Sequence, residues 1–275
     1  MRITCLLPEA SEILAAIGGS SMLVGELDPN APPNQIQSQL AQHNPDLVLA
    51  GPEHASSLGD VPAMILSIST IEDLFDTILN IGQAVGLEGQ ALRLTVSLRG
   101  RMHSAMDFVN PYFDGPAVAI LDGLAPLSIA GLWSVQLIER AGGRCPWNPT
   151  TAAPDAGAAA GPQMAYRSAG PSRRITEAEL AAEPPEFLVL APRGLNRAQA
   201  RAEAEALAAH DWFRSLPAFK ASNIALVDGA QMFNTPGPKL IDAFEFLVGF
   251  LNDRPEQIPA DFPWAIFQMD NKTKI

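Results

Sequence analysis

The sequence predicts an α/β fold in which two Rossmann-like lobes are joined by a single long helix. The chain begins with a short apolar run at Ile3–Leu7, and a helical pattern starts at Ser11. The same alternation starts again with Val118–Leu121 and a helical pattern over Trp133–Ala141. A long helical stretch separates the two starts. Two such lobes imply a ligand cleft between them, because clefts at lobe junctions are common binding sites.

The first lobe, expected over residues 1–87, contains apolar runs that predict the strands of a parallel sheet. Open α/β sheets bind ligands beyond the carboxyl ends of their strands. The loops that begin at Pro8, Asp28 and Gly51 are therefore candidate ligand loops. The expected strands are Ile3–Leu7, Met22–Gly25, Leu47–Ala50 and Ala63–Ile68, with a polar helix over Asn34–His43.

Two helices follow the first lobe. Ser69 or Thr70 is expected to cap the first, which ends at Gly86. The second is expected from Glu88 to Val109 and would span about 33 Å at 1.5 Å per residue. We therefore predict a connecting helix at residues 88–110 and a second lobe at residues 111–275.

The second lobe repeats the alternation of apolar runs and helical patterns. A stretch near residues 148–171, rich in Ala, Pro and Thr, predicts a mobile surface loop. Pro238 suits the first turn of the last helix. The expected strands are Val118–Leu121, Phe187–Leu190 and Ile224–Val227, and the expected helices are Trp133–Ala141, Ile175–Ala182, Arg197–His210 and Lys239–Asn252.

Composition restricts the classes of partner. The 275 residues carry a formal net charge of -12, so a phosphate backbone has no source of attraction and nucleic acid is not expected. No apolar stretch approaches the length of about 18 residues that a membrane span requires. Without a signal peptide the chain is expected in the cytoplasm, and it would be periplasmic or lipid-anchored if a leader had been removed.

Four segments, in this order, resemble the helical-backbone (class III) substrate-binding proteins, the cobalamin and ferric-siderophore receptors of ABC importers, and especially the leaderless cobalamin-binding branch. They are Leu6–Leu14, Pro45–Val48, Ala130–Gly143 and Val227–Pro238. The resemblance implies a binding protein rather than an enzyme. Its ligand would be cobalamin or another corrinoid, heme or ferric chelate, with no cofactor required. An ABC importer would be its protein partner.

The chain departs from that family's pattern around the expected cleft. Cysteines of the pattern are replaced at Glu26–Asp28, Gly51–His54 and Arg193. The aromatic residue expected after the first strand of the second lobe is replaced by Gly123-Leu124, and an expected arginine is Thr235. These changes bear on the ligand, whereas the fold prediction rests on strand ends and helix boundaries.

Several candidate residues have two possible roles, one in ligand binding and one in the structure or on the surface of the protein. His54 would coordinate the metal of a chelate, or is a solvated loop histidine. Trp133 and Phe233 would stack on a macrocycle or pack in the core. Arg193 would bind a carboxylate or phosphate, or form a surface salt bridge. The predicted ligand-binding residues are Pro8, Glu9, Ser11, Glu53, His54, Trp133, Arg193, Asp228, Phe233 and Thr235, with His54 as the metal ligand.

Three other functions remain open. The chain lacks a Gly-x-Ser-x-Gly elbow, a phosphate loop, His-Glu-x-x-His and Cys-x-x-Cys. An enzyme would therefore need Asp122, His54 and Arg193 to converge in the cleft. The second alternative is a cytoplasmic sensor or carrier for another small molecule, and the third is an interaction module that reuses the cleft.

Overall fold

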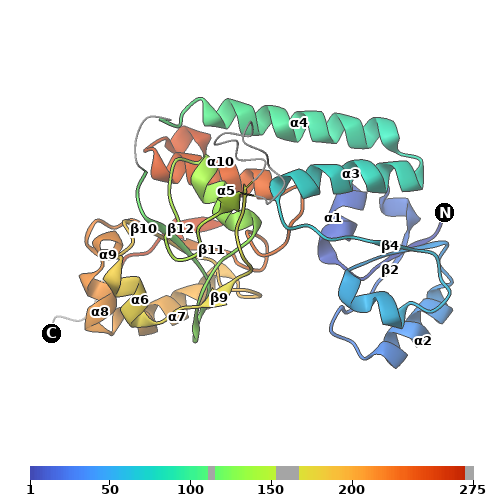
Figure 1. The fold of residues 1–275 in the computed structure, drawn as a ribbon, viewed down its shortest axis with the longest axis horizontal. Coiled ribbons are helices and arrows are strands. Elements are labelled where there is room, and N and C mark those ends of the chain that lie inside the picture. Colours follow the sequence, from blue (N-terminus) through green and yellow to red (C-terminus); the bar gives the residue numbers. More distant parts are fainter. Residues whose placement is uncertain (111–114, 153–166, 270–275) are drawn as a thin grey trace. The chain divides into compact units, whose positions relative to one another are not determined.

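The computed structural model describes residues 1–110, 115–152 and 167–269. The chain divides into two compact α/β units (Figure 1), which confirms the predicted fold class. Unit 1 comprises Met1–Arg101 together with Thr235–Pro238, and unit 2 comprises Met102–Asn234 together with Lys239–Ile275.

Unit 1 is built on a four-stranded, fully parallel sheet in the order β2-β1-β3-β4. Three of the strands are shorter than or shifted from the predicted runs, and β3 has the predicted bounds. The strands are β1 (Ile3–Cys5), β2 (Leu23–Glu26), β3 (Leu47–Ala50) and β4 (Ala63–Ile65). The helices are α1 (Pro8–Ala16), α2 (Pro33–His43) and α3 (Ile71–Val85), with 3₁₀ turns η1 (Ser20–Met22) and η2 (Pro52–Ser57).

Both faces of this sheet are covered, with α2 and η2 on one side and α1 and α3 on the other (Figure 1). Val48 and Ala50 of β3 belong to one core cluster with Ile36 and Leu40 of α2. Leu49, between them, points to the opposite face because strand side chains alternate, and it is fully buried. A sheet buried on both faces explains why the strands read as continuous apolar runs rather than as alternating ones.

The ends of α3 follow the predicted signals. Thr70 is the N-cap, and its hydroxyl accepts from the backbone N–H of Asp73 at 3.1 Å while the Asp73 carboxylate accepts from the N–H of Thr70 at 2.9 Å. Gly86 ends the helix in the left-handed conformation with φ 72°.

The connecting helix α4 spans Glu88–Met106 and is three residues shorter than predicted. The N–H groups of Phe108 and Val109 bond to carbonyls three residues back, which tightens the last turn. Pro111 follows in the sequence and disfavours helical conformation in the residue before it. The boundary between the two units falls inside α4, between Arg101 and Met102.

Unit 2 contains a six-stranded mixed sheet in the order β12-β11-β10-β5-β6-β9. The central strands β5, β10 and β11 are parallel, while β12, β6 and β9 pair antiparallel. The sequence predicted only the parallel core. The strands are β5 (Val118–Leu124), β6 (Leu127–Ile129), β9 (Arg173–Arg174), β10 (Phe187–Leu190), β11 (Ile224–Val227) and β12 (Trp264–Ile266).

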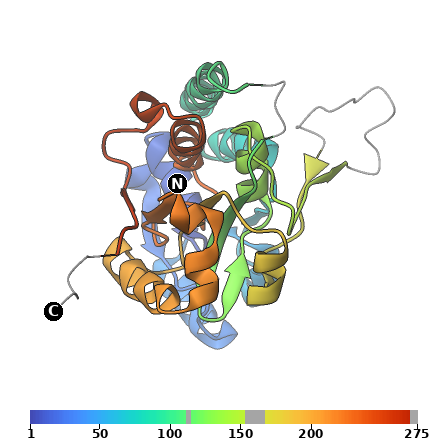
Figure 2. The same cartoon turned by 90° about the vertical axis from the view of Figure 1, so that its left-hand side faces the viewer.

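Helices lie on both sides of the unit 2 sheet, α5 and α10 on one face and α6 to α9 on the other (Figures 1 and 2). Phe244 and Phe246 of α10 are fully buried. The ring of Phe246 stacks on that of Phe262, with 4.5 Å between the ring centroids. These side chains therefore form core rather than an interface. The helices are α5 (Trp133–Arg140), α6 (Glu177–Ala182), α7 (Arg197–Ala208), α8 (Asp211–Ser215), α9 (Pro217–Lys220) and α10 (Leu240–Leu251), followed by the 3₁₀ turn η5 (Pro255–Gln257).

Three local expectations need correction or lie outside the described part. The helix α1 begins at Pro8 rather than at Ser11, and α10 begins at Leu240, so Pro238 precedes its first turn. A two-stranded ribbon, β7 (Thr151–Ala152) with β8 (Arg167–Ser168), flanks residues 153–166. Most of the loop predicted near 148–171 falls on those residues, which are outside the described ranges.

Over the three described ranges, no helix has the length and apolar character needed to cross a membrane.

Candidate functional site

The carboxyl ends of the parallel strands β5, β10 and β11 meet at one edge of the unit 2 sheet, where open α/β sheets bind ligands. A cavity of about 220 Å³ opens near this edge, and we call it the strand-end hollow. Three of the ten predicted ligand-binding residues, Trp133, Arg193 and Phe233, line it together. The full lining is Asp122, Ala130, Gly131, Leu132, Trp133, Ser134, Pro171, Ser172, Arg193, Phe233 and Asn234.

A bulge in β5 positions Asp122. The register pairs Leu121 with Ile129 and Gly123 with Ser128, so Asp122 is the extra residue on its strand. Such bulges interrupt the ladder and turn a side chain away from the regular alternation. The carbonyl of Asp122 also accepts from the backbone N–H of Arg193 at 3.0 Å, which joins the end of β5 to the loop after β10.

The side chains of Asp122 and Arg193 form a close ion pair. Nε and Nη2 of Arg193 donate to Oδ2 of Asp122 at 3.0 and 2.6 Å, and Nη2 also donates to Oγ of Ser172 at 2.6 Å. The carboxylate is 2% exposed, whereas the arginine side chain is 61% exposed. The guanidinium is thus held in one orientation by groups from two other segments of the chain.

Trp133 is fixed at the first position of α5. Its indole Nε1 donates to the backbone carbonyl of Phe233 at 2.7 Å. Phe233 has a positive φ of 67°, and its buried ring lies 6.3 Å from that of Phe246. The Phe233 ring therefore belongs to the core of unit 2, while its carbonyl holds the indole at the hollow.

Two asparagines hold the loops around the hollow, and the sequence interpretation did not include them. Asn234 Nδ2 donates to the carbonyls of Ala191 at 2.9 Å and Gly229 at 2.7 Å. Asn148 Nδ2 donates to the carbonyl of Pro171 at 3.1 Å. Ser172, which contacts Arg193, was also missed. Only the position of Asn234 in the loop after β11 could have drawn attention to any of these residues.

Carboxylates gather at the carboxyl edge of the unit 1 sheet. Glu9 lies in the first turn of α1 and is half-buried. Burial raises the pKa of Glu9, the bond to its own backbone N–H lowers it, and the nearby Glu53 and Glu12 carboxylates raise it further. Pro8 is exposed and Ser11 is half-buried in the same helix. The first predicted ligand loop is thus helical.

His54 is 4% exposed, and both ring nitrogens lie near oxygen atoms. Nε2 is 2.9 Å from the carbonyl of Pro29, and Nδ1 is 3.2 Å from Oε1 of Glu53. The ring thereby connects the loop after β2 to η2. Within the described ranges, no group of three or more His, Cys, Asp or Glu residues is arranged to hold a metal ion. Metal coordination by His54 stays a prediction.

The remaining predicted residues lie elsewhere. Asp228, after β11, accepts from the N–H of Ala230 at 3.1 Å and from Nε2 of Gln231 at 3.1 Å. It lines a separate cavity of about 530 Å³ with Arg197 and Pro263. Thr235 belongs to unit 1. Unit 1 therefore holds six of the ten predicted residues: Pro8, Glu9, Ser11, Glu53, His54 and Thr235.

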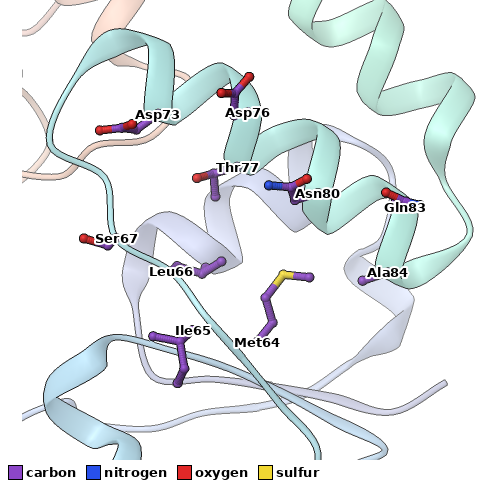
Figure 3. A pocket seen from close by; sticks show the side chains of 10 residues that line it. All are labelled: Met64, Ile65, Leu66, Ser67, Asp73, Asp76, Thr77, Asn80, Gln83 and Ala84. Carbon is purple, nitrogen blue, oxygen red and sulfur yellow. The ribbon is translucent and has the colours of Figure 1, made fainter. Parts of the chain in front are cut away.

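A further hollow of about 490 Å³ lies between β4 and α3 in unit 1, and we call it the β4 groove. Figure 3 shows Met64 and Leu66 facing α3, with Asp76, Thr77 and Asn80 along that helix. None of the predicted ligand-binding residues lines it. Its lining is Met64, Ile65, Leu66, Ser67, Asp73, Asp76, Thr77, Asn80, Gln83 and Ala84.

Comparison with known proteins identifies the fold. No family model matches the chain, and no curated protein sequence matches it. Solved structures do match over almost the whole length. A periplasmic heme-binding protein from Pseudomonas aeruginosa has a TM-score of 0.70 and 20% identity, with 92% of each chain covered.

Two further structures give the same result. The periplasmic heme-binding protein RhuT from Roseiflexus sp. RS-1 has a TM-score of 0.69 and 21% identity, covering 92% of this chain and 98% of its own. The periplasmic vitamin B12-binding protein BtuF of Vibrio cholerae has a TM-score of 0.66 and 15% identity, covering 93% and 98%. The chain therefore has the two-lobe α/β fold of these periplasmic binding proteins.

Proposed function

We propose that this protein binds a metal chelate with a large organic ring, cobalamin first, and that it uses the strand-end hollow to do so. The observation that carries the proposal is the meeting of Trp133, Phe233 and the Asp122–Arg193 pair at the carboxyl ends of β5, β10 and β11. An aromatic side chain beside a few fixed polar groups is typical of small-molecule sites. The proteins of the same fold bind heme or vitamin B12 according to their names.

The size and lining of the hollow agree with this ligand class. Its volume of about 220 Å³ is smaller than the roughly 300–1,000 Å³ of sites that enclose a whole drug-sized ligand. It would receive one edge of a large ring. Among the residues that the structure describes, its lining contains no His, Tyr, Cys or Met. This favours a ligand that brings a complete coordination shell, such as cyanocobalamin, over heme, which takes an axial ligand from its protein.

The physiological setting follows from the same proposal. A protein with this fold that binds such a ligand would deliver it to an ABC importer, as an uptake receptor, or would carry it inside the cell. The cleft predicted between the two lobes, the protein partner and the ten site residues remain predictions. An enzyme that reuses the hollow would convert the ligand, whereas a binding protein would return it unchanged.

The first test is a thermal-shift titration of the purified protein with cyanocobalamin, heme and a ferric siderophore, alongside its absorption spectrum. A ligand that binds only the native state raises the melting temperature as its concentration passes the dissociation constant. We expect a saturable shift with cyanocobalamin and recovery of unaltered ligand. The absence of a shift with all three ligands would overturn the proposal.

Trp133→Phe locates the site. The substitution removes the indole N–H that bonds to the carbonyl of Phe233 and keeps a ring at the position. We expect weaker binding by roughly fivefold, because a hydrogen bond that fixes an aromatic wall contributes about 1 kcal/mol. Asn80→Ala in the β4 groove is the control and should bind as the unchanged protein does. The reverse pattern would move the site to unit 1.

A further inference from the structure

Among the described residues that line the strand-end hollow, the charged side chains belong to a single ion pair. Asp122 and Arg193 are these charged residues, and the other nine are apolar or neutral. The buried partner is the carboxylate and the exposed partner is the guanidinium. A ligand would therefore meet the guanidinium of Arg193, whose positive charge is already neutralised by the buried carboxylate of Asp122.

The guanidinium still has donors to offer. An arginine side chain carries five N–H groups. The bonds to Oδ2 of Asp122 and Oγ of Ser172 come from Nε and Nη2, and in the described contacts Nη1 has no partner. Arg193 can thus donate hydrogen bonds to a ligand while its charge remains paired with Asp122.

We infer that Asp122 sets the charge preference of this site, so that it selects ligand side chains that are neutral carboxamides over carboxylates. The inference rests on the proposed function, because it concerns the same hollow. A carboxylate that enters the hollow loses hydration, and only an uncompensated cation would offset that cost. A carboxamide loses less hydration, its C=O accepts from Nη1 of Arg193, and its N–H groups can donate to the Ser172 or Ser134 hydroxyl.

The test uses two probes with the same ring and different charge. Dicyanocobyrinic acid carries carboxylate side chains, and its heptaamide carries carboxamides at the same positions. The dissociation constants of both probes are measured by isothermal titration calorimetry for the unchanged protein and for Asp122→Asn, Arg193→Gln and the double variant. The quantity of interest is the ratio of the two constants.

The expected ratios move in opposite directions. The unchanged protein should prefer the heptaamide. Asp122→Asn leaves Arg193 uncompensated and should shift the ratio toward the acid by roughly tenfold, the usual effect of a hydrogen bond to a charged group. Arg193→Gln leaves the carboxylate alone and should shift the ratio toward the heptaamide. The double variant should have a ratio near that of the unchanged protein, because the net charge of these two positions is zero in both.

Asp76→Asn is the matched control, since it removes one carboxylate from the β4 groove and changes the net charge equally. Its ratio should equal that of the unchanged protein. Melting temperatures report whether each variant folds, and a ratio is insensitive to partial unfolding because both probes meet the same protein sample.

The outcomes separate the two proposals. The unchanged protein can bind the probes while Asp122→Asn and Asp76→Asn show the same ratio of dissociation constants. That result would overturn the inference about Asp122 and leave the proposed binding function standing. A preference of the unchanged protein for the acid would also overturn it. If the unchanged protein binds neither probe, nor cyanocobalamin, the proposed function fails and the inference fails with it.

Discussion

The imidazole of His54 is buried between the carbonyl of Pro29 and the carboxylate of Glu53. A buried ring with such neighbours connects two loops. The same contacts would have to be broken before either nitrogen could reach a ligand.

We therefore expect His54→Ala to lower the free energy of unfolding by about 1–3 kcal/mol, since it removes a buried ring and the hydrogen bond that this ring makes to the carbonyl of Pro29. Urea denaturation measures this change. The absorption spectrum of cyanocobalamin bound to the variant should match that of the ligand bound to the unchanged protein. A cobalt-ligand band that disappears in the variant would show instead that the imidazole coordinates the metal.

Glu9 gives a prediction with a defined pH dependence. Its pKa is raised in the folded protein, chiefly by burial and further by Glu53 and Glu12. The charged form is therefore disfavoured by folding, and this cost is fully present above the folded pKa. It disappears as the pH falls below the ordinary value of 4.5.

Glu9→Gln should accordingly be more stable than the unchanged protein at pH 7, and its advantage should fade as the pH falls from 7 toward 4. Urea denaturation across that interval measures both curves. Glu177→Gln at the exposed start of α6 is a control of equal charge change. A Glu9→Gln advantage that grows on acidification would contradict the argument.

At the scale of single elements, α3 shows how much a helix depends on its first turn. Thr70→Ala removes the hydroxyl that accepts from Asp73 and should lower the free energy of unfolding by about 1 kcal/mol. Thr70→Ser keeps the hydroxyl and should lose only a few tenths of that amount. Urea denaturation distinguishes them, and equal losses would show that the threonine methyl group, not the cap, matters.

The sequence predicted those elements whose signals are local. The bounds of β3, β10 and β11 and the cap and stop of α3 follow from apolar runs, Thr70 and Gly86. The antiparallel strands β6, β9 and β12 were missed because they are two or three residues long and exist through pairing with a neighbour. Arg173-Arg174 has no strand pattern of its own.

In the candidate site, too, residues with a local signal were predicted, whereas contacts between distant segments were not. Arg193 and Trp133 were predicted because they sit at a strand end and at a helix start. Asp122 and Arg193 were named together only as possible enzyme residues with His54, and their ion pair across 71 positions was not predicted. The bond from Trp133 to the Phe233 carbonyl spans 100 positions and was not predicted either. Only the folded arrangement of three strand ends brings them together.

At the scale of the whole molecule, each unit contains one free cysteine. Cys5 lies in β1 of unit 1 and Cys145 lies in unit 2, and both are buried. Burial is the largest cause that raises the pKa of each thiol to about 11. Neither thiol should react with Ellman's reagent at pH 8 in the native protein, because reaction requires an exposed thiolate.

The two thiols can report on the units separately. The Cys145→Ala variant keeps only Cys5, so labelling of its thiol at increasing urea concentration measures the opening of unit 1. The Cys5→Ala variant keeps only Cys145 and measures the opening of unit 2 in the same way. We expect Cys5 to become reactive at lower urea than Cys145, because unit 1 is the smaller unit and small units bury a smaller fraction of their surface. Coincident curves would show that the molecule opens as one cooperative body.

Neither unit is encoded by one continuous stretch of the gene, because each consists of two separate segments of the chain. Unit 1 is completed by Thr235–Pro238, and Gly237 lies so close to Glu12 that a Cβ at this glycine would be 2.7 Å from the glutamate's Cδ. A gene fragment that encodes residues 1–101 would therefore produce an unfinished unit whose last helix is also cut. Recombination that exchanges one continuous piece of DNA would therefore transfer neither unit whole.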